Sequence, residues 1–156
     1  MVTKYINILV GIPTSGKTTW AYYQQEIYGG VVIISRDDVR DSLAYIQQKK
    51  YVQNKYNENQ VTTIFNNRLT VAVARELDII LDNCHCKESY IDEWIKMKPN
   101  GYTLRIIFFD CPLWKAHIRN VLRYLKTGKW IPIKVIKNMK KNYDKIDRKK
   151  YEHLLY

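Results

Sequence analysis

The chain has 156 residues, of which 46% are hydrophobic and 26% are charged. These values exclude a disordered chain, supply one buried core, and suit a single domain over residues 1–156. The apolar runs are far shorter than the roughly 18 residues that a membrane helix needs, so we expect no membrane partner. Lys and Arg total 26 against 15 Asp and Glu, and the resulting net charge of +11 favours a polyanionic partner.

Two further features point to the cellular compartment. Three cysteines are too few for a disulfide framework. The first residues carry no apolar segment that ends in a small-residue cleavage site. We therefore expect a reducing, cytoplasmic location.

Short apolar runs alternate with longer amphipathic segments along the chain, which is typical of βαβ units around a parallel sheet. We expect strands at residues 4–10, 31–35, 78–81 and 103–109, and helices at residues 16–28, 36–47, 61–76, 87–98, 113–126 and 133–143. Parallel strands need crossover helices, so the pattern predicts an α/β fold with three layers. The polar segment 47–60 has no apolar stripe and is either an exposed helix or a loop over a binding site.

The segment Gly11-Ile-Pro-Thr-Ser-Gly16-Lys17-Thr18 matches the phosphate-loop pattern G-x-x-x-x-G-K-[ST] and lies between an expected strand and an expected helix. Its glycines allow a tight turn whose N–H groups converge on an anion, Lys17 reaches the β- and γ-phosphates, and the Thr18 hydroxyl ligates Mg²⁺. This position disfavours a coincidental strand–turn–helix connection. The residues predicted to bind the nucleotide are Gly11, Pro13, Thr14, Ser15, Gly16, Lys17, Thr18 and Thr19.

Asp37 and Arg40 directly follow the second expected strand, at the edge of the sheet where open α/β folds bind ligands. Their i,i+3 spacing places both on one helix face. A carboxylate there can accept the proton of an attacking hydroxyl, and a guanidinium can clamp a phosphate of the acceptor. The alternative is a surface ion pair beside an acidic helix N-terminus.

Asp82 ends the third expected strand, which suits a residue that holds a Mg²⁺-bound water or an acceptor at the sheet edge. The alternative is a carboxylate that caps a turn. The neighbouring Cys84-His85-Cys86 invites a zinc interpretation, but it supplies only three donors and no paired C-x-x-C is present. We expect His85 to pack near the site or to be solvated.

Arg119 and Arg123 share one face of the expected helix 113–126, and fixed cations from a separate segment are what phosphoryl transfer needs. With Gly128 beyond them, they predict a mobile lid over about 113–131. The alternative is an exposed charged helix face. The following segment, about 132–147, predicts a helix that docks on an apolar stripe and is rich in lysine, either as a solvated face or as a track for phosphodiesters.

In the order of these motifs, the chain resembles the polynucleotide 5′-kinases, including the kinase domain of bacteriophage polynucleotide kinase/phosphatase. The resemblance runs from about residue 4 to 143 and depends on the phosphate loop with Trp20, the R-D-D-x-x-R element 36–40, Asp82, and the R-N-x-x-R element 119–123. It implies a P-loop NTPase/kinase fold with a mainly parallel sheet and a helical lid. It also implies ATP and Mg²⁺ as cofactors and a nucleic acid with a 5′-hydroxyl end as partner.

The same resemblance implies roles for individual residues. Lys17 holds the donor phosphates, Asp37 is the general base, and Arg40 contacts the 3′-phosphate of the acceptor. Arg123, with Arg119, is a lid arginine on the donor. Asp82 and Asn83 bind the acceptor, although the family usually continues from the strand-end Asp with Thr-Asn, where this chain has Asn83-Cys84.

The lid segment 124–127 resembles an insertion relative to the family, and from the length of 156 residues we expect no phosphatase domain. Two alternatives remain beside the polynucleotide kinase. One is a P-loop kinase of a nucleoside, another small hydroxyl substrate or a modified base in DNA, with segment 47–60 as its specificity lid. The other is a non-catalytic nucleotide-gated module, for which Asn54-Lys55-Tyr56-Asn57 is a weak guanine-reading pattern without its Asp.

Overall fold

The computed structural model describes residues 3–46 and 57–156. Four parallel strands form one sheet in the order β2-β3-β1-β4. The strands are β1 (Lys4–Val10), β2 (Val31–Ile34), β3 (Asp78–Leu81) and β4 (Tyr102–Phe108). The helices are α1 (Lys17–Tyr28), α2 (Arg36–Ile46), α3 (Glu58–Ala74), α4 (Glu88–Lys96), α5 (Leu113–Thr127), α6 (Ile133–Tyr143) and the 3₁₀ helix η1 (Arg148–Leu154).

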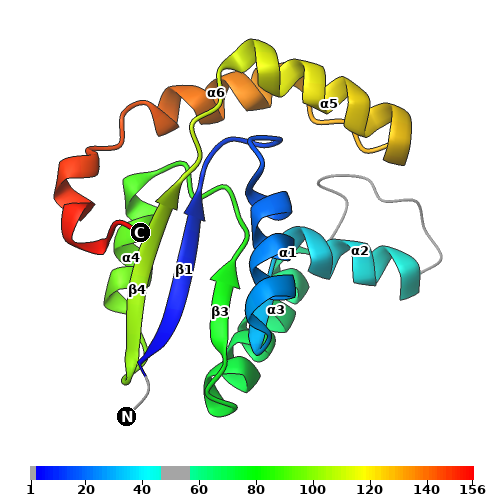
Figure 1. Cartoon of the computed structure of the whole chain (residues 1–156). Coiled ribbons are helices and arrows are strands. Elements are labelled where there is room, and N and C mark those ends of the chain that lie inside the picture. The colour runs from blue at the N-terminus through cyan, green and yellow to red at the C-terminus, as the bar shows by residue number, and fades with distance from the viewer. Residues whose placement is uncertain (1–2, 47–56) are drawn as a thin grey trace.

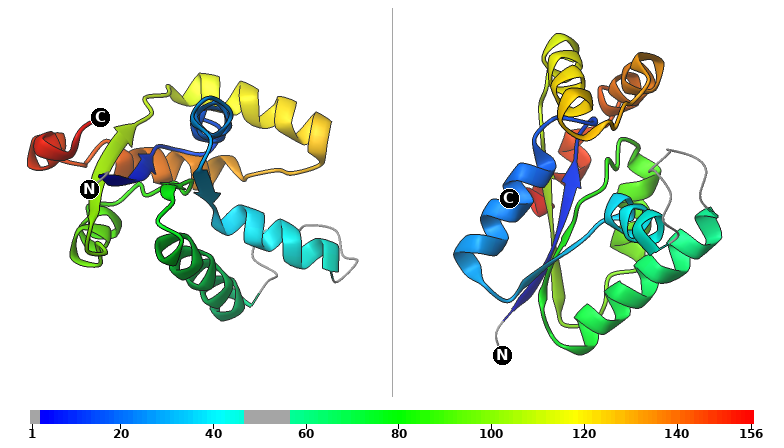
Figure 2. Two further views of the ribbon diagram at one scale, coloured as in Figure 1. Left: turned by 60° about the horizontal axis from the view of Figure 1, so that its bottom comes forward. Right: turned by 90° about the vertical axis from the view of Figure 1, so that its right-hand side faces the viewer.

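The helices form layers on both faces of the sheet. Figure 1 shows α1 on one face and α3 and α4 on the other, while α5 and α6 lie across the carboxyl ends of the strands. The right-hand view of Figure 2, in which the sheet is seen from its edge, shows the same separation of α1 from α3. The predicted α/β fold is therefore confirmed, and its carboxyl edge lies under α5.

Alternation along the central strand divides the core between these faces. Ile6, Ile8 and Val10 of β1 are buried in the main core cluster together with Phe65 of α3. Leu9, between them, is buried on the opposite face with Ala21 of α1. Because successive strand residues face opposite sides, a sheet covered on both faces needs a continuous apolar run, which β1 has at residues 8–10.

Most boundaries agree with the sequence prediction to within one or two residues. The largest difference that can be measured is at α3, which begins at Glu58, three residues before the expected start. The Asn57 carboxamide accepts hydrogen bonds from the backbone N–H groups of Asn59 and Gln60 and so caps the helix. Of the polar segment 47–60, residues 47–56 lie outside the described part, including most of the Asn54–Asn57 pattern.

The basic helix α6 docks as its apolar stripe predicts. Ile136 and Tyr143 are buried, and Val135 and Met139 pack against the same core cluster. After α6 the chain forms η1, which the sequence did not predict, and Tyr151 of this helix is fully buried. Among the described helices, none is long and apolar enough to cross a bilayer.

Candidate active site

The phosphate loop joins β1 to α1 through left-handed backbone conformations. Thr14 has φ 62° and Gly16 has φ 110°, and α1 begins at the next residue, Lys17. Gly11 has no space for a side chain, because a Cβ there would lie 2.8 Å from Ser15 Oγ and 2.9 Å from Phe109 Cβ. The first amides of α1 have no helical acceptor and lie beside this turn, so the loop is an anion-binding concavity.

Lys17 is buried in this loop, with 6% of its surface exposed. Its ammonium group donates hydrogen bonds to the carbonyl oxygens of Gly11 at 2.9 Å and Ile12 at 2.8 Å. The hydroxyl of Ser15 lies 3.4 Å away. The positive charge is thus held inside the loop by backbone carbonyls, where a phosphate group would meet it.

Thr18 and Asp82 meet at the mouth of the loop. The Thr18 hydroxyl donates a hydrogen bond of 2.6 Å to Asp82 Oδ2. Burial raises the pKa of Asp82, while the hydrogen bond from Thr18 and the charge of Lys17 act in the opposite direction. A hydroxyl and a carboxylate are hard oxygen ligands that suit Mg²⁺, and a cation there would offset the cost of burying Asp82.

Helix α5 docks on the phosphate loop from above. Arg119 Nη1 donates to the carbonyl oxygens of Thr14 and Ser15, both at 3.2 Å. The Thr14 hydroxyl in turn donates to Ala116 O at 2.9 Å. Arg123 lies one turn further along α5, is half-buried, and its charge lowers the pKa of Asp82. The structure therefore brings Arg119 into contact with the loop, and Arg123 close enough to Asp82 to act on its charge.

Asp37 and Arg40 lie at the start of α2, at the same edge of the sheet. Ser35 caps this helix, because its hydroxyl accepts from the backbone N–H of Asp37 at 3.2 Å. Arg40 Nη1 donates to Asp37 Oδ1 at 2.8 Å. The charge of Asp37 also acts to raise the pKa of Asp82, so the two carboxylates are close enough to repel each other.

Arg40 has a second carboxylate partner that the sequence prediction missed. Its Nε and Nη2 donate to Glu58 Oε1 and Oε2 at 3.0 Å and 2.9 Å. Arg36 Nη2 donates to Glu58 Oε2 as well, at 3.0 Å. The sequence does carry a signal for this helix start: Asn57 is a capping residue and Glu58 an acidic residue of the first turn, both inside the polar segment 47–60.

The side chain of Asn83 bonds to a backbone group in this structure. Its Oδ1 accepts a 3.1 Å hydrogen bond from the N–H of Arg36, the first residue of α2. The side chain of Asn83 therefore ties the end of β3 to the beginning of α2. Its predicted contact with the acceptor stays a prediction.

His85 is a packed residue, as expected. Burial lowers its pKa to about 4, so the ring is neutral at physiological pH. Nδ1 is then the donor to Leu9 O at 2.9 Å, and Nε2 accepts from Trp94 Nε1 at 3.1 Å. Both ring nitrogens are thus used within the fold. In the described part of the chain, no three or more His, Cys, Asp or Glu side chains form a group that could hold a metal ion.

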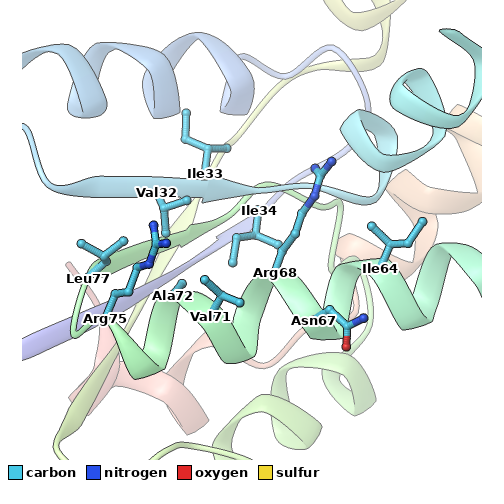
Figure 3. A pocket seen from close by; sticks show the side chains of 10 residues that line it. All are labelled: Val32, Ile33, Ile34, Ile64, Asn67, Arg68, Val71, Ala72, Arg75 and Leu77. Carbon is cyan, nitrogen blue, oxygen red and sulfur yellow. The ribbon is translucent and has the colours of Figure 1, made fainter. Parts of the chain in front are cut away.

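A cavity of about 510 Å³ lies away from these residues, between β2 and α3. Figure 3 shows its lining, which is apolar apart from Asn67, Arg68 and Arg75. Arg68 donates to Ser42 Oγ at 3.3 Å. None of the predicted site residues lines this cavity, so the candidate active site is the phosphate loop with its surroundings.

A family model described as an AAA domain matches residues 6–146. The chain belongs to this AAA domain family. The match spans the phosphate loop, α2, Asp82 and both arginines of α5. No curated protein matches the sequence.

Several solved structures share the fold of this AAA domain chain. A chain of the Pnkp1/Rnl/Hen1 RNA repair complex superposes with a TM-score of 0.81 at 21% identity, over 96% of this chain and 47% of that chain. A gluconokinase from Sinorhizobium meliloti 1021 gives 0.58 at 14% identity, over 99% and 82%. The PezAT toxin–antitoxin system of Streptococcus pneumoniae gives 0.63 at 16%, over 100% and 69%. This chain thus spans less than half of its counterpart in the repair complex.

Proposed function

We propose that the chain is an ATP-dependent kinase that transfers the γ-phosphate to the 5′-hydroxyl end of a nucleic acid. The observation that carries this proposal is the Asp37–Arg40 pair, held 2.8 Å apart beside Asp82 and the phosphate loop. It provides a proton acceptor and a cation at the edge where the donor phosphate would lie. The structural similarity to a chain of an RNA repair complex and the net charge of +11 support a nucleic-acid acceptor.

On the donor side, the loop amides and Lys17 bind the β- and γ-phosphates of ATP. Thr18 and Asp82 would hold Mg²⁺, which when bound neutralises phosphate charge. Arg123 adds positive charge beside Asp82, where charge develops on the transferred group. Arg119 keeps α5 on the loop through Thr14 and Ser15.

On the acceptor side, the hydroxyl oxygen forms a bond to the γ-phosphorus while the bond from that phosphorus to the β–γ bridging oxygen breaks and ADP leaves. The hydroxyl proton passes to the carboxylate of Asp37. Because bond formation lags behind bond breaking in such a transition state, a weakly basic carboxylate suffices. Arg40 holds Asp37 in place and presents positive charge to the acceptor phosphate.

The test is a competition for radiolabelled phosphate from ATP among four acceptors: single-stranded DNA, single-stranded RNA, a free nucleoside and gluconate. We expect label on the 5′ ends of oligonucleotides and loss of labelling at high salt, since backbone contacts release counterions. Labelling of the nucleoside or gluconate with none on oligonucleotides would contradict the proposal and favour a small-molecule kinase. The AAA domain family match and the fold are compatible with either result.

A further inference from the structure

Glu58 is the carboxylate on which two arginines of α2 converge. It accepts a pair of hydrogen bonds from Arg40 at 3.0 Å and 2.9 Å, and one from Arg36 at 3.0 Å. The Glu58 side chain is 48% exposed, so hydrogen bonds to the arginines, and not burial, hold the carboxylate in place. Three charge-assisted hydrogen bonds restrict this carboxylate more than a single bond restricts an ordinary surface ion pair.

The position of Glu58 is fixed by its own helix. It is the first residue of α3, directly after the capping residue Asn57. Its carbonyl oxygen accepts from the Thr62 hydroxyl at 2.8 Å, and the same hydroxyl accepts from Arg36 Nη2 at 2.9 Å. The carboxylate therefore stands on a rigid helix start, and α3 and α2 are joined through it.

Arg40 passes this orientation on to Asp37. One edge of the planar guanidinium, Nε and Nη2, is bound side-on by Glu58, and Nη1 on the same plane bonds to Asp37. A guanidinium held at one edge cannot rotate without breaking both bonds of the fork. The Arg40 side chain is only 18% exposed, which restricts it further.

The Glu58 carboxylate is charged under working conditions. The hydrogen bond from Arg40 lowers its pKa, and the hydrogen bond and charge of Arg36 act in the same direction. The charge is therefore present throughout the neutral pH range in which a kinase operates.

We propose that Glu58 is a positioning residue that fixes the Arg40 guanidinium, and through it the Asp37 carboxylate, for removal of the acceptor proton. The inference rests on the proposed function only in that Asp37 is the proton acceptor. Glu58 itself touches neither substrate nor nucleotide in this assignment. It acts on turnover through Arg40.

The kinetic test uses the full chain with ATP, Mg²⁺ and a 5′-hydroxyl oligonucleotide. Glu58→Gln keeps the size of the side chain but removes the charge, and we expect kcat to fall about tenfold with KM for ATP within about twofold of the wild type. Glu58→Asp keeps the charge and should recover part of the loss. Glu26→Gln, the same charge change at an exposed site on α1, should leave kcat unchanged. A kcat of Glu58→Gln within twofold of the wild type would overturn the proposal.

A double-variant cycle separates this role from a general structural one. In an Arg40→Ala background, Glu58→Gln should cost no further activity, because its effect runs through the missing guanidinium. A further tenfold loss in that background would show that Glu58 acts by another route, and would overturn the assignment.

An NMR measurement tests the contact without any acceptor. The Arg40 Nε–H signal should exchange slowly with water in the wild type and rapidly in Glu58→Gln, whereas Glu26→Gln should not change it. The measurement tests the Glu58–Arg40 contact even if oligonucleotides are not phosphorylated. In that case the proposed acceptor would be wrong, and slow exchange of the Arg40 signal would still support the contact. An Arg40 signal unaffected by Glu58→Gln would overturn the contact whatever the acceptor is.

Discussion

The phosphate loop and the cluster of Asp37, Arg40 and Glu58 hold their charges in different ways. In the loop, Lys17 is buried and its main partners are two backbone carbonyls. In the cluster, the charges bond to one another, and the side chains of Asp37 and Glu58 are 54% and 48% exposed. One region is organised by backbone, and the other by side chains in contact with water.

The difference indicates where specificity lies. Backbone carbonyls and amides keep their positions whenever the strand–loop–helix unit forms, so donor binding can be common to many proteins of this fold. The cluster exists only where several particular side chains occur together, since each position depends on the partner side chain. Under the proposed function, ATP use therefore belongs to the loop and the choice of acceptor to the cluster.

The largest effect should come from the loop. Lys17→Ala removes the buried cation beside the donor phosphates and should lower kcat/KM by at least about 10³-fold with every acceptor. Lys17→Met, which keeps the buried stem, should be as inactive, so that loss of packing is not the cause. The measurement is steady-state phosphate transfer, and wild-type activity in either variant would contradict the role of the loop.

Asp37→Asn should remove the proton acceptor from the cluster while leaving the loop intact. Turnover should fall about 10²- to 10³-fold because only the proton acceptor changes. ATP affinity, measured by calorimetry, should stay within about twofold of the wild type. Asp38→Asn, the neighbouring substitution, is the matched control and should have a smaller effect on turnover. Equal loss of ATP binding and turnover in Asp37→Asn would show that the two regions are not separable.

His85, beneath the loop, provides a test by pH. Its pKa is about 4 in the fold, because of burial, against an ordinary value near 6.5. Between these values the unfolded chain binds the proton and the folded chain does not, so stability is lost as the pH falls from 6.5 to 4, by about 3 kcal/mol in all. Urea unfolding of His85→Asn should show a weaker dependence over this range. The raised pKa values of Asp38 and Asp82 change the stability in the opposite direction as the pH falls, and both are present in the wild type and in His85→Asn. An unchanged dependence would contradict the assignment.

The same contrast explains what the sequence could predict. The positions of the strands and of the loop follow from apolar runs and from glycines with fixed spacing, which are local signals. The Arg40–Glu58 contact joins residues 18 apart, and the Asp41–Lys129 contact joins residues 88 apart, and neither has a local pattern. Asp37 and Arg40 could be predicted as a pair since they share a helix turn, whereas Glu58 at the start of α3, which bonds to Arg40, could not.

The smallest expected effect belongs to the ion pair that connects the segment after α5 with α2. Lys129 Nζ lies 2.6 Å from Asp41 Oδ1, with side chains 23% and 40% exposed. In contact with water, such a pair should contribute less than about 1 kcal/mol, and the contribution should fall at high salt. A cycle of Asp41→Asn and Lys129→Met in urea unfolding at low and high salt measures it. If the coupling exceeded that range or resisted salt, a solvated ion pair beyond the start of α2 would be held as firmly as the loop. The difference between a backbone-held donor site and a solvated acceptor site would then not hold.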